Sequence, residues 1–257
     1  MRYLTGEDVT AAGPLAPDVL VLDDCLRALR AIPDNSVDMV LADLPYGTTA
    51  CKWDVVIPFE PMWSEIWRVV RPDGAVCLFG SEPFSTHLRM SAIDHYRYDW
   101  YWDKKFGGNF VQAKRMPLKS VETISVFAKH QALPRYFPIM TDRAAPIVQG
   151  GTKTAAAIPV KNRAETHTKR VYDKKYPVTL LPYPKELGRT QHPTQKPVEL
   201  RDYLMRTHTL AGETVLDFCM GSGSTGVASL RAKRQFIGIE KDPDYFEIAR
   251  SSLRDEV

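Results

Sequence analysis

Short, nearly continuous apolar runs alternate along this chain with segments whose apolar positions recur at helical spacing. Runs of this kind are typical of strands that are buried on both faces of a parallel sheet. In the first third of the chain they predict strands at 19–22, 37–42 and 75–79. The intervening segments predict helices, each followed by turn residues, over about 25–31, 62–70 and 83–93.

The same alternation returns near the carboxyl terminus. Strands are predicted at 214–218 and 235–239, with a helix at about 224–232 between them, a helix opening at Pro197 and a closing helix after Asp242. Two middle strands, at 98–102 and 122–127, are expected to be antiparallel to each other. Segment 104–119, with Gly-Gly-Asn and five basic residues, reads as a mobile loop. The pattern predicts an α/β fold: a mostly parallel, twisted sheet with helices on both faces.

One stretch breaks this pattern. From 130 to about 190 the periodicity fades while Pro and basic residues accumulate. This stretch has eleven Lys and Arg residues against four acids, a balance of +7, so the remainder of the chain, which totals +3, carries −4. The asymmetry fits an inserted segment that faces a polyanion, and a solvated basic surface is the equally weighted alternative.

Composition bounds the remaining possibilities. The 257 residues suffice for one large domain or two small ones, with ordinary apolar and charged fractions. Cysteines stand at 25, 51, 77 and 219, without the spacing of a zinc site or a disulfide framework, so no metal is expected. Neither a secretory signal nor an apolar run of membrane length is seen, which favours a cytoplasmic protein without a membrane partner. The oligomeric state stays open, a homodimer included.

The first candidate site is Asp43-Leu44-Pro45-Tyr46, which directly follows the strand at 37–42. Residues past the carboxyl end of a parallel strand face the ligand crevice of an open α/β sheet. The tetrapeptide offers a carboxylate, a backbone carbonyl in a Pro-stiffened turn and an aromatic ring. These groups could accept two N–H bonds from an exocyclic amine and stack on its base. A strand-ending Asp followed by a structural turn is the simpler interpretation.

The second candidate site follows the strand at 214–218. Gly221-Ser-Gly223-Ser-Thr-Gly226 is a G-x-G-x-x-G turn leading into a helix, and Glu240 ends the next strand. Such a unit binds nucleotide-like ligands, because the glycines allow close backbone approach and the acid can accept both ribose hydroxyls. A dinucleotide site would need further strands after Glu240, yet only one helix remains. The missing strands must then come from the amino-terminal end, so the order of motifs is permuted.

Together these motifs resemble the beta group of DNA amino-methyltransferases, of the phage or restriction–modification type, in which the catalytic motif precedes the cofactor motif. Asp-Leu-Pro-Tyr46 is similar to the family's (Asp/Asn/Ser)-Pro-Pro-(Tyr/Phe/Trp), with Leu44 in place of the first Pro. The run from Asp217 to Thr225 resembles its S-adenosylmethionine loop, and Ile-Gly-Ile-Glu240 resembles its ribose-binding strand end. Asp24-Cys25 resembles the segment whose acid reaches the cofactor adenine, and His192-Pro-Thr-Gln-Lys-Pro197 resembles the helix-opening motif beside the cofactor's methionine end.

The resemblance implies a Rossmann-like methyltransferase fold with an inserted target-recognition region. It divides the chain into a catalytic half (1–129), a basic recognition insertion (130–190) and a cofactor-binding half (191–257). The implied catalytic residues are Asp43, Leu44, Pro45 and Tyr46. The implied S-adenosylmethionine contacts are Asp24, Asp217, Phe218, Gly221, Ser222, Gly223, Ser224, Thr225, Glu240, His192, Thr194 and Lys196. Two of these have alternatives: His192 could be a helix-start contact, and Lys196 could pair with a surface acid.

The implied activity is methyl transfer from S-adenosylmethionine to an amine of a base flipped out of double-stranded DNA. In this family an Asp at the first catalytic position usually accompanies adenine N6, and Ser accompanies cytosine N4. We therefore predict an adenine-N6 methyltransferase, with the N4-cytosine enzyme as the alternative. Two other classes stay open: a nicotinamide-dependent oxidoreductase, and a nucleic-acid-binding regulator that holds the cofactor without turnover. The methyltransferase hypothesis requires Asp43 and the Gly221 loop to meet at one sheet edge.

Overall fold

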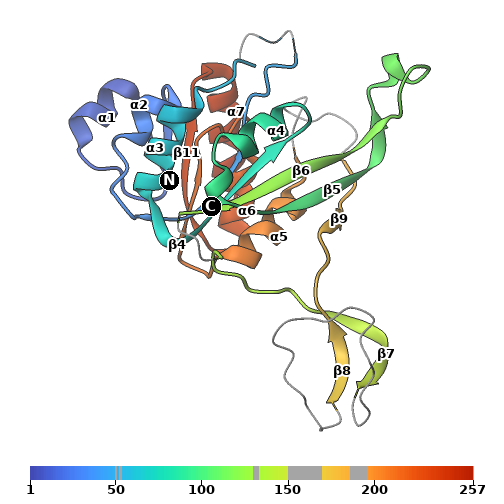
Figure 1. Cartoon of the computed structure of the whole chain (residues 1–257). Helices are drawn as coiled ribbons and strands as arrows, with labels where there is room; N and C mark the ends of the chain where they lie inside the picture. The colour runs from blue at the N-terminus through green and yellow to red at the C-terminus, as the bar shows by residue number, and fades with distance from the viewer. Residues whose placement is uncertain (50, 52–53, 130–132, 150–169, 186–195, 257) are drawn as a thin grey trace. The chain divides into compact units, whose positions relative to one another are not determined.

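The structure is a computed structural model that describes residues 1–49, 51, 54–129, 133–149, 170–185 and 196–256 (Figure 1). The chain forms two compact units. The larger unit comprises Met1–Phe137 and Thr179–Val257, and the smaller one, Pro138–Val178, interrupts it in sequence. No helix among the described residues combines the length and apolar character needed to cross a bilayer.

In the described residues, the larger unit is built on one nine-stranded sheet, in the order β1-β2-β11-β10-β3-β4-β6-β5-β9. Neighbours are parallel from β1 through β4, β6 is antiparallel to both β4 and β5, and β9 is parallel to β5. The predicted mostly parallel sheet and the antiparallel pairing of the two middle strands are therefore confirmed. The strand bounds are β1 Arg2–Thr5, β2 Val19–Leu22, β3 Val37–Asp43, β4 Val70–Gly80, β5 Tyr96–Gly108, β6 Lys119–Ala128, β9 Leu180–Pro182, β10 Thr214–Asp217 and β11 Gln235–Glu240.

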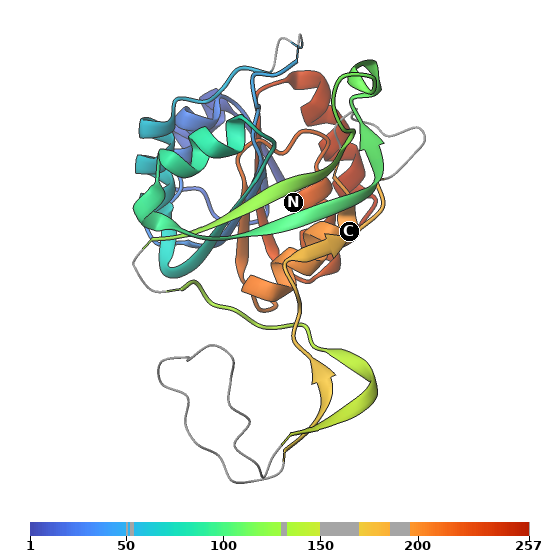
Figure 2. The same cartoon turned by 45° about the vertical axis from the view of Figure 1, so that its right-hand side comes forward.

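Helices cover both faces of this sheet, as Figure 2 shows. Side chains of β3 alternate between two apolar clusters: Val40 and Ala42 pack in the cluster that contains helices α2 to α4, and Met39 and Leu41 pack in the cluster that contains α5 and α6. This alternation explains why the strand sequence is apolar throughout. The helix bounds are α1 Gly6–Ala12, α2 Cys25–Leu29, α3 Phe59–Val69, α4 Phe84–Met90, α5 Val198–His208, α6 Ser224–Arg231 and α7 Pro243–Arg254, with 3₁₀ turns η1 Ile93–His95 and η2 Phe110–Gln112.

The carboxyl-terminal strands lie inside the sheet rather than at its edge. β10 pairs with β3 through Val215 opposite Met39, and β11 pairs with β2 through Ile237 opposite Val19. The last unit of the chain thus fills the space between two strands of the first half. The permuted, Rossmann-like topology predicted from the motif order is confirmed.

Two segments differ from the sequence-based expectations. Residues 1–17 were given no secondary structure, yet β1 adds an edge strand beside β2 and α1 follows it. Segment 104–119, interpreted as a loop, is strand at its two ends, since β5 continues to Gly108 and this residue pairs with Lys119, while 109–118 form the connecting loop that contains η2. The hairpin escaped prediction because its side chains do not alternate clearly between polar and apolar.

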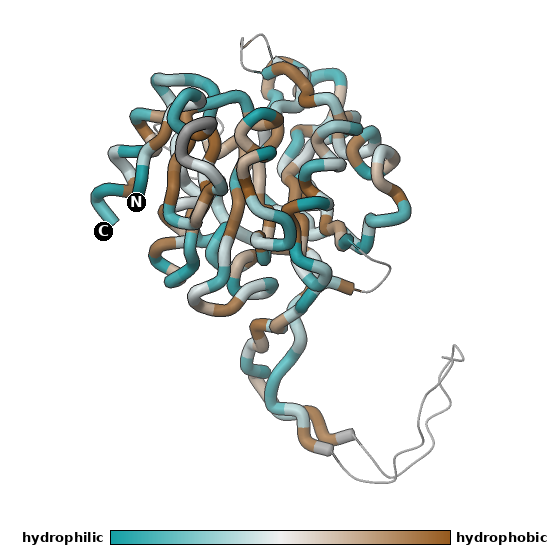
Figure 3. Tube along the Cα trace, turned by 90° about the vertical axis from the view of Figure 1, so that its left-hand side faces the viewer, coloured by the Kyte–Doolittle hydropathy of each residue, from teal (hydrophilic) through white to brown (hydrophobic). Residues whose placement is uncertain are grey.

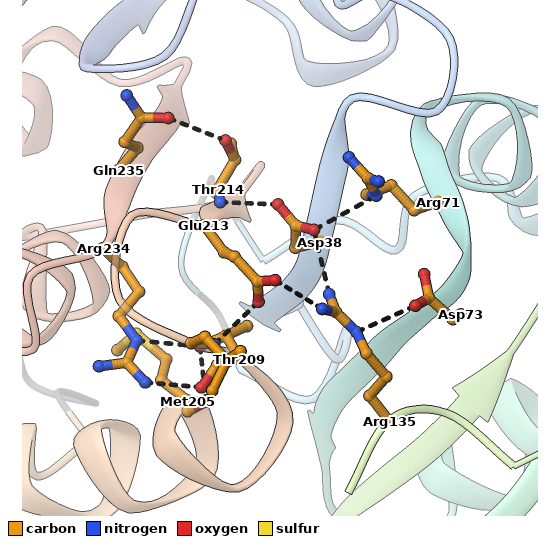
Figure 4. Close-up of polar contacts among 11 residues, drawn as sticks. Asp38, Arg71, Asp73, Arg135, Met205, Thr209, Glu213, Thr214, Arg234 and Gln235 are labelled. Carbon is orange, nitrogen blue, oxygen red and sulfur yellow. Dashed lines mark hydrogen bonds and ion pairs between the residues drawn. The ribbon is translucent and has the colours of Figure 1, made fainter. Parts of the chain in front are cut away.

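A polar network ties together the amino ends of the central strands (Figure 4). Asp38 on β3 accepts a hydrogen bond from the backbone N–H of Thr214, 2.9 Å away, and contacts Arg135 at 3.0 Å. Arg135 also binds Glu213 at 2.5 Å and Asp73 at 3.2 Å. Arg135 belongs to the basic stretch assigned to DNA recognition, but its guanidinium is committed to ion pairs in the larger unit. This network braces the sheet at the edge opposite the candidate site.

The smaller unit contains, in its described residues, one antiparallel pair of strands, β7 (Thr141–Gln149) and β8 (Arg170–Lys175). Its apolar side chains Ile147, Val148 and Val171 are exposed. An isolated two-stranded ribbon is only marginally stable in water. In the larger unit the apolar residues of the central strands are buried, and Figure 3 shows hydrophobic stretches running through this part of the trace.

Candidate active site

A cavity of about 310 Å³ opens at the carboxyl ends of the central parallel strands. Its wall includes Asp43, Leu44, Pro45 and Tyr46, which follow β3. It also includes Gly221, Ser222 and Glu240, from the turn after β10 and the end of β11. The two candidate motifs therefore line one cavity, as the methyltransferase hypothesis required. The parallel pairing of β10 with β3 is what brings them together.

The Asp43 carboxylate is held by two donors. The Tyr46 hydroxyl donates to Oδ1 at 2.8 Å, and the Lys196 ammonium donates to Oδ2 at 2.7 Å. An ionised carboxylate can accept about four hydrogen bonds, so each oxygen retains accepting capacity. The two contacts fix the orientation of the carboxylate in the cavity wall while leaving it able to accept an amine proton.

Lys196 is almost fully buried, with 4% of its surface exposed. Its ammonium contacts Glu122 at 3.3 Å as well as Asp43. Burial alone would lower the pKa of Lys196, but the two carboxylates outweigh it and raise the pKa. Lys196 was expected to meet the cofactor carboxylate or a surface acid. The contacts in the structure are instead with two partly buried acids, Asp43 and Glu122, and a cofactor contact stays a prediction.

Glu122 completes this charged cluster from the antiparallel strand β6. Burial would raise the pKa of Glu122, but the ammonium groups of Lys196 and Lys104 lower it. The Lys104 ammonium lies 3.2 Å from Glu122 Oε1. Two carboxylates and two ammonium groups thus alternate from Asp43 to Lys104, and the cluster is balanced in charge. Buried charges are tolerated when they are paired in this way.

Tyr46 has an apolar environment on one side of its ring. The ring stacks on Phe84 with centroids 5.1 Å apart and an interplanar angle of 28°. Burial and the nearby Asp43 carboxylate raise the pKa of the Tyr46 phenol well above its usual value. Tyr46 is therefore a neutral hydrogen-bond donor at physiological pH. Leu44, which replaces the family's first Pro, is 4% exposed and packs in the apolar cluster on the α3 side.

Asp54 organises the turn after Tyr46. Its carboxylate accepts backbone hydrogen bonds from Gly47 at 2.8 Å, Thr48 at 2.9 Å and Thr49 at 2.6 Å. Burial would raise the pKa of Asp54, but these hydrogen bonds lower it. The backbone at Gly47 has a positive φ of 68°, which glycine adopts readily. Asp54 and Gly47 together fix the path of the chain that leaves the candidate motif at 43–46.

The other side of the cavity is formed by the glycine turn and Glu240. Glu240 Oε2 accepts the backbone N–H of Gly221 at 2.9 Å, and Oε1 accepts those of Lys241 and Asp242, each at 2.9 Å. Burial raises the pKa of Glu240, and these hydrogen bonds oppose that effect. Phe218, Ser222 and Ser224 also line the cavity, and their predicted contact with a cofactor stays a prediction. This combination of backbone and carboxylate fits a ligand that carries vicinal hydroxyls.

Three predicted cofactor residues do not line the cavity. Asp217 is fully buried and contacts Arg201, the Thr225 hydroxyl and, at 3.1 Å, the Cys219 backbone N–H. Burial raises the pKa of Asp217 to about 6, against the opposing effect of Arg201. Gly223 has a φ of 84° and packs closely on Ala249 of α7. Asp217, Gly223 and Thr225 shape the turn from behind, and their direct contact with a cofactor stays a prediction.

Asp24 lines the cavity and also caps α2. Its Oδ1 accepts the backbone N–H groups of Leu26 at 3.0 Å and Arg27 at 3.3 Å. The cap orients the carboxylate. Its second oxygen, Oδ2, accepts neither of these two hydrogen bonds. His192 and Thr194 lie outside the described residues.

The sequence analysis missed Glu122, Lys104 and Asp54. Glu122 begins a predicted middle strand, and the sequence does not show what its side chain contacts. Lys104 is one of five basic residues in an expected loop. Asp54 carried a weak signal, because an acid a few residues after a glycine turn often accepts backbone N–H bonds. None of these three side chains could be placed near Asp43 without the register of β6 against β4 and the path of the Gly47 turn.

Comparison with known proteins agrees with this geometry. Residues 37–251 match the sequence profile of the N6/N4 family of DNA methylases. The type II methyltransferase M.HpaI of Haemophilus parainfluenzae is 26% identical over 252 residues, which cover 92% of this chain and 74% of that protein.

Solved structures show the same fold. The PvuII DNA methyltransferase, described as cytosine-N4-specific, aligns with a TM-score of 0.65 and 17% identity over 94% of this chain and 88% of its own. TTHA0409 of Thermus thermophilus, a putative DNA modification methylase complexed with S-adenosyl-L-methionine, aligns with a TM-score of 0.61 and 18% identity over 93% of each chain.

Proposed function

The chain belongs to the N6/N4 DNA methylase family, and we propose that it transfers a methyl group from S-adenosylmethionine to the N6 amine of an adenine extruded from double-stranded DNA. The observation that carries the proposal is the shared cavity. Asp43 and Tyr46 line it from one side, and Gly221 and Glu240 line it from the other. The proposed amine acceptor and the proposed nucleoside-binding turn thus line one cavity.

The residues present fit S-adenosylmethionine. The cavity volume of about 310 Å³ falls in the range of small-molecule sites, roughly 300–1,000 Å³. Glu240 accepts three of the roughly four hydrogen bonds that a carboxylate can take, so Oε2 retains capacity for a ribose hydroxyl, and Asp24 also lines the cavity, where it could meet the adenine amine. The acids in the wall also suit a positively charged sulfonium group. When bound, this cofactor supplies an activated methyl group, and the protein needs to supply position and electrostatics.

Asp43 would act on the nucleophile. The lone pair of an aromatic amine is delocalised into the ring, so the nitrogen attacks poorly. Acceptance of its two N–H bonds by the Asp43 carboxylate and the Leu44 carbonyl favours a pyramidal nitrogen and stabilises the positive charge that develops during attack. Once the nitrogen had gained the methyl group, the Asp43 carboxylate would hold the amine proton that the nitrogen gives up and pass it to water. Holding donor and acceptor in line supplies much of the acceleration.

Lys196 and Tyr46 would keep Asp43 ready for this task. Their bonds of 2.7 and 2.8 Å keep the carboxylate in place before the base arrives. The base must leave the duplex at a cost of a few kcal/mol, on the order of 2–4. Stacking on the Tyr46 ring would offset part of that cost, by roughly 1–3 kcal/mol as for single-stranded bases.

The choice of adenine rests on Asp43. In the family that this chain resembles, Asp at this position usually accompanies adenine N6, whereas Ser accompanies cytosine N4. The PvuII enzyme has the opposite specificity in its description, but a likeness at 17% identity concerns the fold. The N4-cytosine enzyme is therefore the second candidate, and the same product analysis separates the two.

The basic segment between 130 and 190 is the proposed target-recognition region. Its Lys and Arg side chains would contact phosphates and base edges. Among its described members, Lys174 and Lys175 are exposed on β8. Arg135 is left out of this role, because its partly buried guanidinium is already paired with Asp38 and Glu213.

The test is product analysis of plasmid DNA. Plasmid from a methylation-deficient host is incubated with the protein and S-adenosylmethionine, digested to nucleosides and analysed by mass spectrometry. N6-methyldeoxyadenosine supports the proposal, N4-methyldeoxycytidine replaces it with the second candidate, and neither product would refute both.

Replacing the acceptor tests the mechanism. Asp43→Ala should reduce methyl transfer by roughly 10²–10³-fold, since it removes a group that stabilises transition-state charge. Cofactor binding, measured by calorimetry, should change little, because Asp43 is proposed to contact the base. Retained turnover in Asp43→Ala would remove Asp43 from the reaction.

A further inference from the structure

The hairpin formed by β5 and β6 extends past the carboxyl edge of the parallel strands. The last pair between β4 and β6 joins Gly80 to Thr123, so residues of β6 before Thr123 have no partner on β4. They pair with β5 instead, through Glu122 opposite Trp102 and Lys119 opposite Gly108. At about 3.3 Å per strand residue the hairpin reaches on the order of 15 Å beyond the edge. Figures 1 and 2 both show it projecting from the sheet.

The outer part of this hairpin carries a group of solvent-exposed apolar side chains. Val111 is 94% exposed, and Phe110, whose ring lies 5.4 Å from that of Phe106, is 57% exposed. Such a cluster of large apolar groups on a projecting element indicates a contact surface rather than ordinary surface variation. We call it the hairpin tip: Phe106, Phe110, Val111, Met116 and Leu118, all at least 38% exposed.

The charge around the tip has one sign. From 104 to 121 the sequence contains five basic residues and no acid. Lys114 and Arg115 are exposed, and neither takes part in an ion pair among the described residues. The exposed apolar side chains could pack on flat apolar groups of a partner, while Lys114 and Arg115 bind negative charges beside those groups. Stacked bases between phosphates are such a partner.

The root of the hairpin is part of the cavity wall. Trp102 and Glu122 pair across the two strands, and both line the cavity. Glu122 contacts Lys196, and Lys196 contacts Asp43. The tip therefore stands on the same rigid element that supplies part of the charged cluster around the proposed acceptor. A duplex whose base entered the cavity would lie beside this element.

We propose that the hairpin tip contacts duplex DNA beside the extruded base: Phe110 and Val111 pack against the bases at the vacated position, and Lys114 and Arg115 bind the adjoining phosphates. This inference rests on the proposed function, because an extruded base is its premise. It adds a second DNA-contacting element to the segment at 130–190. It also assigns to the tip the task of holding the duplex open.

The test compares three variants of the full chain. Phe110→Ala/Val111→Ser removes the apolar contacts, and Lys114→Gln/Arg115→Gln removes the two charges. Leu210→Ala is the matched control, because Leu210 is 52% exposed but precedes β10, at the opposite edge of the sheet. The probe is a fluorescent duplex that carries the sequence methylated by the wild type, identified by sequencing modified positions in treated plasmid. A second version has 2-aminopurine at the target base, and a third has a mismatch there.

The two hairpin variants should fail differently. Loss of the apolar pair should weaken duplex binding by about tenfold or more and reduce the 2-aminopurine signal, as expected for lost base contacts. Its salt dependence should stay unchanged, and the mismatched duplex should restore much of the affinity. Loss of the two charges should lower the slope of log K against log salt by about 1–2, near 0.9 per phosphate contact. Leu210→Ala should match the wild type.

Each other outcome has a defined meaning. If the wild type methylates no plasmid, the proposed function itself fails. If it methylates plasmid and both hairpin variants bind duplex with wild-type affinity and salt slope, the inference about the tip is wrong. If Phe110→Ala/Val111→Ser instead turns a dimer into a monomer in sedimentation while DNA affinity is kept, the tip is an interface between two copies and the DNA contact is excluded.

Discussion

Replacing Lys196 with Met is the most informative single change at this site. Met keeps much of the side-chain volume and removes the charge. The ammonium lies 2.7 Å from Asp43 and 3.3 Å from Glu122, and only 5% of the side chain is exposed. Without it, the partly buried Asp43 carboxylate would lose its ammonium partner, and Glu122 would keep only Lys104 of its two.

The expected loss of stability follows from burial. Removing one partner of a buried ion pair costs about 3–5 kcal/mol, because the other partner stays desolvated and unpaired. The pair between Lys105 and Asp103 has the same separation, 2.7 Å, but the Lys105 side chain is 56% exposed. Removing an exposed partner costs about 0–1 kcal/mol. Lys105→Met is thus the matched control for distance, and it isolates the effect of burial.

The assay is urea unfolding of both variants near neutral pH, together with the pH dependence of methyl transfer. In Lys196→Met the like charges of Asp43 and Glu122 should raise the pKa of one of the two carboxyl groups. Transfer should therefore be about tenfold slower near neutral pH and should recover as the pH rises, as the shared proton is lost. Adding Glu122→Gln should restore part of the stability, with a coupling energy of about 1–3 kcal/mol.

Two results would refute this reasoning. The first is a Lys196→Met protein no less stable than Lys105→Met, which would mean that the buried cluster contributes nothing beyond a surface pair. The second is a pH profile identical to that of the wild type, which would mean that the charge of Lys196 has no influence on the groups whose titration affects methyl transfer.

Three further changes test the supporting structure. Gly223→Ala should destabilise the fold by about 2–4 kcal/mol in thermal unfolding, since a Cβ there would lie 2.7 Å from Leu253. Gly212→Ala is its control, because Gly212 has the same φ of 84° but a Cβ there would have no atom within 4 Å. This variant should show only the backbone cost of about 1–2 kcal/mol. Burial lowers the pKa of His208 to about 4. As the pH falls from 6.5 to 4, the unfolded chain gains a proton that the folded chain does not, so the free energy of unfolding should fall by up to about 3 kcal/mol. A His208→Gln protein that loses as much stability over this range would contradict the assignment. Asp54→Asn leaves one side-chain oxygen for three backbone N–H donors, so it should lower the free energy of unfolding by about 1–3 kcal/mol and slow methyl transfer. A variant that melts and turns over like the wild type would argue against the role of Asp54 in the turn.

The sequence was sufficient wherever local pattern and sheet topology determine position. The apolar runs at β3 and β10 are long enough to identify buried strands, and parallel strands end at a common edge. Asp43 and Glu240, each at the end of such a strand, could therefore be assigned to one cavity before the structure was known. The capped start of α7 was equally readable, because Asp242 followed by Pro243 is a local signal: its carboxylate accepts the N–H groups of Asp244 and Tyr245.

Long-range register was beyond the reach of the sequence. Lys196 and Asp43 are separated by 153 residues, and no local pattern shows that a lysine in a helix-opening motif will be buried against a carboxylate. Glu122 depends on how β6 slides against β4, where a shift of one residue would turn its side chain to the other face. The burial of Asp217 behind the glycine turn was out of reach for a related reason, since its contacts with Arg201 of α5 and Thr225 of α6 reflect helix packing rather than the motif itself.

The position of β10 and β11 between β2 and β3 has a consequence for synthesis of the chain. When the first two hundred residues have left the ribosome, β2 and β3 still lack the strands that separate them in the finished sheet. Both present open edges, and open edges invite pairing with other chains. Productive folding must therefore wait for the final segment, which favours late, non-local closure and slow kinetics. A nascent chain of this protein is a natural client for a chaperone until its last strand emerges.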